Sequence, residues 1–554
     1  MTNSLKISLA QLNPVVGDIE GNVAKIRAAR LAASGQGADL VVGTELCVTG
    51  YPPEDLILKN AFVRAAMKAV EELAVETADG GPGLIIGTPW LDEDGRRFNA
   101  AAVLDDGKVQ TLRFKWDLPN YGVFDEKRVF DSGELPGPVN FRGVRLGLAV
   151  CEDMWTPDVA ETLMESGAEI LVIINGSPYE RDKVDVRMNH AVARVTEAEL
   201  PLIYVNQVGG QDELVFDGGS FVLNADRRMV AASKQFVEDL TLTEWARGDD
   251  GWICVSGEVN DWIEGRERIY QAMVLGLRDY VNKNGFPGVI LGLSGGIDSG
   301  ITAVVAVDAL GHDRVHCVMM PSPYTREDSL EDALELAERL GVRYDSANIG
   351  PAMGAFDEML IEIFNEPASG VTAENIQSRA RGALLMAVSN STGSMLVTTG
   401  NKSEMSVGYA TIYGDMNGGY SVIKDVYKSD VFALCHWRNA HYPKEVLGPE
   451  GEVIPKRMIS KPPSAELRPD QKDEDSLPPY EMLDAILHGL IEEDLSGAEL
   501  EAKGFDAAIV QRIWRLLELS EYKRRQAPPG VKLTSRSFGR DRRYPITNAF
   551  RGKA

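Results

Sequence analysis

The sequence predicts an α/β protein built from two successive domains, and three observations along its 554 residues support this fold class. Short apolar runs of strand length alternate with amphipathic stretches of helix length, two predicted hairpins interrupt the alternation in the first half, and the pattern changes between residues 232 and 262. At roughly 100–200 residues per domain, a chain of this length forms two to four domains.

The first 230 residues are predicted to form a layered domain with a mixed sheet. Hairpins are expected at 98–114, with Asp106-Gly107 at the turn, and at 218–231. Amphipathic helices are expected at 19–34 and 60–78. Six apolar runs predict strands: 5–11, 38–45, 83–90, 145–152, 169–176 and 201–208. Hairpins combined with strand–helix alternation favour a mixed sheet covered by helices.

The second half repeats strand and helix without hairpins, which is typical of a doubly wound parallel sheet. Residues 1–245 are assigned to the first domain, the acidic stretch 246–262 to a connector, and residues 263–554 to the second domain. The helices expected after the connector are 263–285, 298–310, 327–340 and 374–390, and the strands are 288–294, 314–321, 343–349 and 394–400.

Charge and composition exclude several classes of partner. With 57 Lys and Arg against 83 Asp and Glu, the formal net charge is −26, which disfavours nucleic acid and anionic lipid as main partners. No apolar run is long enough to cross a membrane, so no membrane partner is expected. Five scattered cysteines without a CxxC pair indicate a reduced, cytoplasmic protein.

The C-terminal tail, residues 522–554, has the opposite charge. It contains ten Lys and Arg residues against the single acid Asp541. Two interpretations stay open: a solvated basic face, or an arm that contacts phosphates or another subunit.

A candidate nucleophile ends one predicted strand. Cys151 follows the apolar run RLGLAV, while Glu45 and Lys115 end two other predicted strands. Sites of α/β proteins form where strands end, and a thiol needs a base and a positive group that stabilises an oxyanion. From the residues alone, this trio is a candidate, because Glu and Lys at strand ends also serve solubility.

A glycine-rich loop follows the predicted strand at 288–294. The sequence GLSGGIDS, residues 292–299, stands between this strand and a helix, which is the arrangement that binds phosphate through backbone N–H groups. The loop is not a Walker A motif, because it has no lysine after its glycines. The alternative is a tight strand–helix turn with Asp298 as a cap.

Four motifs in the first half resemble the nitrilase-type amidase family, in particular its glutaminase branch: TELCVTGYPPEDL, KWDLPNYGVFDEKRVF, CEDMW and NGSPY. This resemblance implies an α-β-β-α sandwich. It also implies that Glu45 is the general base, Lys115 the oxyanion support and Cys151 the nucleophile. The resemblance further implies that Tyr121, Ser177 and Lys183 bind glutamine.

The second half resembles ATP pyrophosphatases of the adenine nucleotide α-hydrolase type, through its SGGxDS loop. MPSPYTREDS, ENIQSRARGALLM, TTGNKSEMSVGYAT and YGDMNGGYSVIKDVYKSDV are similar to the motifs of NAD synthetases. The resemblance implies that deamido-NAD (nicotinic acid adenine dinucleotide) contacts Asn375, Glu404 and Lys523, and that Mg²⁺ is bound by Asp298 and Glu404. It assigns ATP binding to Gly292, Leu293, Ser294, Gly295, Gly296, Ile297, Asp298, Ser299, Thr399 and Lys428.

The combined architecture resembles that of glutamine-dependent NAD synthetases. The resemblance implies a carbon–nitrogen ligase that adenylates deamido-NAD and amidates it with ammonia from glutamine, and it implies at least a homodimer formed through the synthetase domain. Because ammonium has no lone pair with which to attack, ammonia is expected to travel in a passage closed to solvent. Two alternatives remain open: an amidotransferase with another adenylated acceptor, and an amide hydrolase with a nucleotide-sensing regulatory half.

Overall fold

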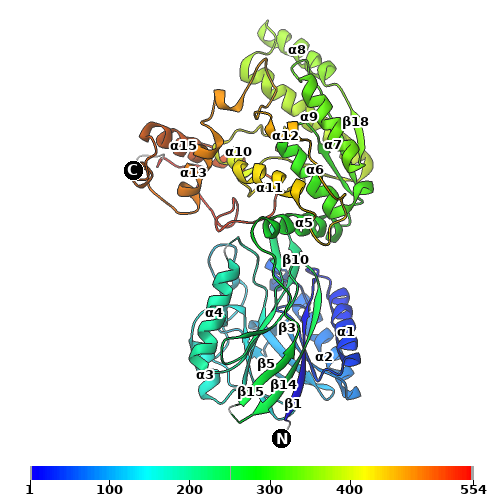
Figure 1. The fold of residues 1–554 in the computed structure, drawn as a ribbon, viewed down its shortest axis with the longest axis vertical. Coiled ribbons are helices and arrows are strands. Elements are labelled where there is room, and N and C mark those ends of the chain that lie inside the picture. The colour runs from blue at the N-terminus through cyan, green and yellow to red at the C-terminus, as the bar shows by residue number, and fades with distance from the viewer. Residues whose placement is uncertain (1–2, 182, 250, 551–554) are drawn as a thin grey trace. The chain divides into compact units, whose positions relative to one another are not determined.

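The computed structural model describes residues 3–181, 183–249 and 251–550. The chain divides into two compact units, Met1–Glu264 and Gly265–Ala554, and Figure 1 shows the fold of each. No helix among the described residues is long and apolar enough to cross a membrane.

The first unit contains two sheets. The larger has the order β15-β14-β1-β2-β3-β4-β5, the other has the order β13-β12-β9-β8-β7-β6, and a two-stranded ribbon pairs β10 with β11. The strands of the larger sheet are β1 (Ser4–Gln11), β2 (Leu40–Val42), β3 (Gly83–Leu91), β4 (Arg97–Asp105), β5 (Lys108–Phe114), β14 (Asp239–Gly248) and β15 (Gly251–Gly257). Those of the second sheet are β6 (Val139–Phe141), β7 (Val144–Val150), β8 (Ile170–Asn175), β9 (Leu202–Asn206), β12 (Phe221–Leu223) and β13 (Met229–Ala232), and the ribbon is β10 (Val208–Gln211) with β11 (Leu214–Asp217).

The two sheets pack face to face and helices cover their outer faces, which confirms the predicted α-β-β-α sandwich. Leu9 and Ile85 of the larger sheet share one apolar core with Leu148 and Val172 of the other. The helices α1 (Ile19–Gly35) and α2 (Asn60–Glu76) cover the larger sheet, and α3 (Asp158–Glu165) and α4 (Lys183–Ala198) cover the second (Figure 1). The hairpin turn at Asp106-Gly107 is present, with positive φ at both residues.

The stretch expected as a connector, 246–262, lies mostly in the larger sheet. β14 pairs antiparallel with β1, and β15 pairs antiparallel with β14. The stretch contributes residues to both of these strands. Asp250 lies outside the described residues. The inward positions of the two strands are Thr241, Thr243, Trp245, Trp252 and Cys254. None of these buried residues is aliphatic. The alternation of buried and exposed positions could therefore not be recognised as a strand from the sequence.

The second unit contains a parallel five-stranded sheet in the order β18-β17-β16-β19-β20, which confirms the doubly wound fold. Its strands are β16 (Val289–Gly292), β17 (Val315–Met319), β18 (Arg343–Ser346), β19 (Met395–Thr398) and β20 (Tyr420–Ser421). The helices that follow or cover them are α5 (Gly265–Lys283), α6 (Ile297–Leu310), α7 (Glu327–Leu340), α8 (Gly350–Phe364), α9 (Gly370–Thr392), α10 (Lys402–Val407) and α11 (Lys428–Ala440).

A helical lobe completes the second unit. It is formed by α13 (Tyr480–Ile491), α14 (Gly497–Ala502), α15 (Ala507–Leu519) and α16 (Glu521–Arg524), whereas α12 (Lys456–Ser460) packs on α6 and α11. Leu487, Ile513 and Leu517 pack there with Met405 of α10, so the apolar face of this lobe fixes the helix that carries Glu404.

The described part of the basic tail is docked on this lobe. Arg524, Lys532 and Arg542 are buried and form ion pairs with Glu521, Asp541 and Glu518, respectively. The solvated-face interpretation is therefore wrong for these three residues, because nearby acids neutralise them in the interior. Arg551 and Lys553 lie outside the described residues.

Candidate active sites

Cys151 occupies a sharp turn at the end of β7. Its φ of 48° places a non-glycine residue in the left-handed region, where it begins the short 3₁₀ turn Cys151–Met154. The thiol is buried, and burial together with the charge of Glu45 raises its pKa well above the ordinary value, although Lys115 lowers it. The resting residue is therefore a protonated thiol that needs a base.

A buried ammonium lies between two buried carboxylates beside this thiol. Lys115 Nζ is 2.8 Å from Glu45 Oε1 and 2.9 Å from Glu126 Oε2, and the lysine and Glu45 have no exposed side-chain surface. Burial lowers the pKa of Lys115, but the charges of Glu126 and Glu45 together raise it well above its ordinary value. Lys115 thus remains a fixed positive charge.

Glu45 is fixed by three donors. Its Oε1 accepts hydrogen bonds from Lys115 and from Asn99 Nδ2 at 2.7 Å, and its Oε2 accepts one from the Gly176 N–H at 2.8 Å. Glu126 accepts a hydrogen bond from the Tyr51 hydroxyl at 2.7 Å. The structure therefore brings together the predicted Glu45, Lys115 and Cys151, and adds Glu126 and Asn99.

Neither added residue was predicted from the sequence. Glu126 stands in the quoted motif FDEKRVF, but nothing in its neighbours distinguishes it from the exposed acids around it. Asn99 lies inside a strand, where an inward polar residue among apolar neighbours is the only available signal.

The three residues predicted to bind glutamine lie on segments close to this site. The Tyr121 hydroxyl donates to Glu152 at 3.0 Å, next to the nucleophile in sequence. Lys183 Nζ lies 5.1 Å from the Phe124 ring centroid and 5.6 Å from that of Trp155. Ser177 is buried one residue beyond Gly176, which contacts Glu45.

The glycine-rich loop of the second unit joins β16 to α6. Gly295 has a φ of 77°, and a Cβ at this position would lie 2.2 Å from the Ser329 carbonyl oxygen, so only glycine fits. Ser299 Oγ donates to the Gly296 carbonyl at 2.9 Å and accepts from the Ser294 N–H at 3.2 Å. The loop is thereby held around the N-terminus of a 14-residue helix, which favours bound anions.

This loop forms one wall of a cavity of about 270 Å³. Seven of the eight predicted loop residues line it, as do Thr399, Glu404 and Lys428, which come from segments a hundred or more residues further along the chain. Gly295 is the loop residue that does not line it. The cavity is close in size to a small-ligand site, and its lining combines apolar side chains with convergent polar and charged groups.

Asp298 and Glu404 face each other across Lys428. Lys428 Nζ pairs with Asp298 Oδ2 and lies 3.3 Å from Glu404 Oε1. Burial and the charge of Asp298 raise the pKa of Glu404 to about 8, while Lys428 lowers it. Asn401, which the sequence analysis missed, bridges the pair by donating to Asp298 Oδ1 at 2.9 Å and capping α10 at the Glu404 N–H.

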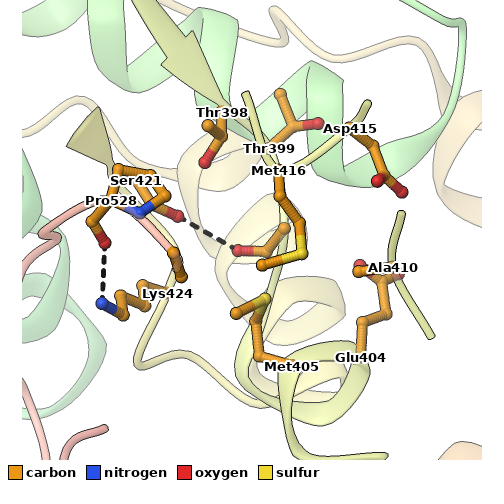
Figure 2. Close-up of a pocket in the computed structure, with 12 residues that line it drawn as sticks. Thr398, Thr399, Glu404, Met405, Ala410, Asp415, Met416, Ser421, Lys424 and Pro528 are labelled. Carbon is orange, nitrogen blue, oxygen red and sulfur yellow. Dashed lines mark hydrogen bonds between the residues drawn. The ribbon is translucent and has the colours of Figure 1, made fainter. Parts of the chain in front are cut away.

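A second cavity, of about 60 Å³, adjoins the first and shares Thr398, Thr399, Glu404 and Asp415 with it. Figure 2 shows these side chains around the cavity, with Lys424 donating to the Pro528 carbonyl at 2.7 Å. The segment that contains Pro528 belongs to the basic tail, which therefore forms part of this wall.

Asn375 and Lys523 do not line the larger cavity. Lys523 Nζ donates to the carbonyl oxygens of Gly408 and Ala410 at 2.7 Å each, and Asn375 Oδ1 accepts from the Thr411 hydroxyl at 3.0 Å. Both residues thus hold the 408–411 segment, which borders the smaller cavity at Ala410.

Metal binding was predicted at Asp298 and Glu404. Among the described residues, no group of three or more His, Cys, Asp or Glu side chains is arranged to hold a metal ion. Two carboxylates beside a phosphate loop nevertheless fit Mg²⁺, which is commonly held by one or two carboxylates together with substrate phosphates.

Comparisons with known proteins match both units. The carbon–nitrogen hydrolase family model matches residues 6–249, and the NAD synthase model matches residues 269–527. The chain is 51% identical over 554 residues to the glutamine-dependent NAD(+) synthetase of Rhodobacter capsulatus, covering 100% of each chain. It is 44% identical over 548 residues to that of Acinetobacter baylyi, covering 99% of each.

Two solved structures agree with this assignment. The glutamine-dependent NAD+ synthetase of Acinetobacter baumannii in complex with ADP is 43% identical, with a TM-score of 0.78 over 100% of both chains. That of Cytophaga hutchinsonii, 21% identical with a TM-score of 0.82, covers 99% of this chain and 98% of its own and shares the fold.

The fold and the two sites define a carbon–nitrogen ligase that joins a glutamine-hydrolysing domain to an ATP-using synthetase domain. At the identities above and over its full length, the chain belongs to the glutamine-dependent NAD(+) synthetase family. The resemblance drawn from the motifs is confirmed.

Proposed function

We propose that this protein converts deamido-NAD to NAD, with ATP as the activating substrate and glutamine as the nitrogen donor. AMP, pyrophosphate and glutamate are the other products. One observation supports the proposal above the rest: a buried thiol beside a Glu–Lys–Glu cluster and a glycine-rich phosphate loop stand in one chain.

In the first unit, Glu45 accepts the thiol proton and Cys151 attacks the carboxamide carbon of glutamine. Lys115 and the backbone N–H after the nucleophile stabilise the oxyanion. Collapse of this intermediate releases ammonia, and water then hydrolyses the thioester. Tyr121, Ser177 and Lys183 are proposed to bind the substrate.

In the second unit, residues 292–299 hold the ATP phosphates while the nicotinate carboxylate attacks the α-phosphate. Adenylation is needed because a carboxylate carbon is electron-rich and its oxygen is a poor leaving group. Lys428 and Thr399 contact ATP, and Asn375, Glu404 and Lys523 are assigned to the dinucleotide. Ammonia then displaces AMP.

Asp298 and Glu404 would hold Mg²⁺, which neutralises phosphate charge when it is bound. Lys428 compensates one of their two negative charges, and the phosphates supply the remaining ligands. Asp298→Ala and Glu404→Ala are expected to abolish synthesis from glutamine and from ammonium alike, since adenylation precedes both.

The proposal includes a homo-oligomer formed through the synthetase unit, in the cytoplasm. The described residues of α8 are all at least partly exposed, and its apolar side chains Phe356, Met359, Ile363 and Phe364 form an apolar surface of the kind that subunits bury. Five free cysteines fit a reducing compartment.

Pyrophosphate release tests the proposed reaction. The purified chain is mixed with ATP, Mg²⁺ and deamido-NAD, with glutamine or ammonium chloride as the nitrogen source, and pyrophosphate and NAD are measured. Both products are expected with both nitrogen sources. Acceptor-dependent pyrophosphate without NAD would favour an amidotransferase with another acceptor, and no pyrophosphate at all would favour a regulatory second half.

Ammonia is proposed to pass from the first reaction to the second without mixing with solvent. The test supplies amide-¹⁵N glutamine together with excess unlabelled ammonium and measures the label in NAD. Retention of most of the label supports the passage, whereas dilution in proportion to the ammonium pool contradicts it.

A further inference from the structure

We propose that Asp153 is a positioning residue that holds the strand end carrying Lys115 in register with the turn carrying Cys151. The inference deepens the proposed function, because it rests on the amidase role of these two residues. Asp153 stands two positions after the nucleophile, and its carboxylate is 2% exposed.

The Asp153 carboxylate joins two segments that are distant in the sequence. Its Oδ1 accepts hydrogen bonds from the N–H groups of Trp116 at 3.0 Å and Asp117 at 2.8 Å. Its Oδ2 accepts from the Val150 N–H at 2.9 Å. Trp116 directly follows Lys115, and Val150 directly precedes Cys151, so one side chain contacts the neighbours of both catalytic groups.

These two segments belong to different sheets. Lys115 follows β5 at the edge of the larger sheet, whereas Cys151 follows β7 of the second sheet. Between the sheets the contacts are mainly apolar, and such contacts are non-directional. Charge-assisted hydrogen bonds are directional and short, so they fix a relative position that apolar packing leaves loose.

The turn at Cys151 gives a second reason for this role. Its left-handed φ is sterically disfavoured for a residue with a side chain, and such conformations persist only where surrounding contacts enforce them. Asp153 supplies such a contact by accepting a hydrogen bond from the N–H of Val150, the residue that directly precedes the turn. The Thr156 hydroxyl donates to Asp117 Oδ2 at 2.7 Å, a neighbouring hydrogen bond that involves none of the backbone N–H groups that Asp153 holds.

Asp153 is not assigned a proton-transfer role. Both of its oxygens accept hydrogen bonds from backbone N–H groups. Glu45 is the carboxylate whose charge most strongly affects the pKa of the Cys151 thiol. Burial raises the pKa of Asp153 to about 7, and the backbone donors and Lys115 lower it, which is the environment of a structural acceptor rather than of a solvated acid.

The test uses the full chain with Asp153→Asn, which keeps the shape but turns one oxygen into an amide that faces an N–H donor. The kcat for glutamine hydrolysis is expected to fall about 100-fold, the cost of misplacing reacting groups by about 1 Å. Ammonium-driven NAD synthesis should stay at the wild-type rate. Thr156→Val, which removes only the neighbouring hydrogen bond, is the matched control and should retain glutamine hydrolysis.

Alkylation of Cys151 by iodoacetamide, followed by peptide mass spectrometry, separates positioning from mere stability. If Asp153 holds Lys115 near the thiol, the alkylation profile of Asp153→Asn shifts to higher pH than in the wild type. A lowered melting temperature with an unchanged kcat and alkylation profile overturns the proposal.

Should Asp153→Asn fail to fold, Asp153→Glu replaces it, because it keeps the charge and displaces the acceptors by one methylene. A folded Asp153→Glu protein with wild-type glutamine hydrolysis would then overturn the proposal, and a reduced kcat with normal ammonium-driven synthesis would support it. Cys151→Ala is run in parallel. If that variant still hydrolyses glutamine, the proposed amidase site fails, whatever Asp153 does.

Discussion

Arg438 and Asp308 form a fully buried ion pair in the second unit, with Arg438 Nε 2.8 Å from Asp308 Oδ2. A second contact joins Arg438 Nη2 to Oδ1 at 3.1 Å, and Tyr270 donates its hydroxyl to Oδ2 at 2.5 Å. Asp308 lies in α6 ten positions after Asp298, and Arg438 lies in α11 ten positions after Lys428. The two helices are therefore joined near both ends, and the Arg438 pair stabilises the arrangement that places Lys428 beside the phosphate loop.

Removing one partner of this pair should destabilise the second unit strongly. Arg438→Met leaves the Asp308 carboxylate buried and uncompensated, which is expected to cost about 3–5 kcal/mol of unfolding free energy. Chemical denaturation followed by circular dichroism measures the change. Arg343→Met, which breaks the exposed pair with Asp345, is the control and should change stability little. Equal stability of the two variants would contradict the account.

Lys115→Met tests the oxyanion role in the first unit. Methionine preserves much of the side-chain volume but removes the positive charge, so glutamine hydrolysis is expected to fall by about 10²–10³-fold, the cost of losing one oxyanion donor. Synthesis from ammonium chloride, measured on the same preparation, should be unaffected. Wild-type glutamate release by the variant would rule out the assigned role.

The rate of glutamine hydrolysis at acid pH should depend on the protonation of Asp153. Burial raises the pKa of Asp153 to about 7, and its protonation would place a hydroxyl where the backbone presents N–H donors. Glutamate release is therefore expected to fall as the pH drops below about 7, and protonation of Glu126, whose pKa burial also raises, acts in the same direction.

The effect of Asp153 on stability has the opposite sign. Its folded pKa exceeds that of the unfolded chain, so the stability it contributes is fully present only below about pH 4 and is lost as the pH rises from there through about 7. Glutamate release and denaturation midpoints are measured from about pH 4 to about pH 8.5, which spans this loss. Glutamate release that stays flat to the acid end would contradict the requirement for ionised Asp153.

The basic tail calls for a point variant rather than a truncation. Cutting the chain at Ala527 would remove Thr534, whose hydroxyl accepts a hydrogen bond from buried Lys402 and whose N–H donates to Asp425. Such a truncation should destabilise the lobe.

Lys523→Ala removes the two hydrogen bonds to Gly408 and Ala410 together with the charge attraction to Asp415, so it should loosen this segment and raise the KM for deamido-NAD with a smaller change in kcat. Steady-state kinetics with ammonium as the nitrogen source measure both constants. Arg540→Ala, which removes another basic side chain of the tail, is the control. An unchanged KM in Lys523→Ala would remove the residue from the dinucleotide site.

Local sequence signals predicted the parts of the fold that follow simple periodicities. The phosphate loop was predictable because strand, glycines and helix are contiguous in the chain, and Cys151 because it directly follows the buried apolar run 146–150. β14 and β15 could not be predicted as strands, because their buried positions hold Thr, Trp and Cys. Glu126, Asn401 and Asp153 acquire their roles only from partners elsewhere in the chain, which no local pattern encodes.

The central claim is that Cys151 releases, from the amide of glutamine, the ammonia that the second unit transfers to deamido-NAD. The most direct measurement supplies amide-¹⁵N glutamine, ATP and Mg²⁺ to the wild type and to Cys151→Ala and determines the mass of the NAD formed. The account predicts ¹⁵N-labelled NAD from the wild type, none from the variant, and full recovery of unlabelled NAD when the variant receives ammonium chloride. Labelled NAD formed by Cys151→Ala at the wild-type rate would contradict it.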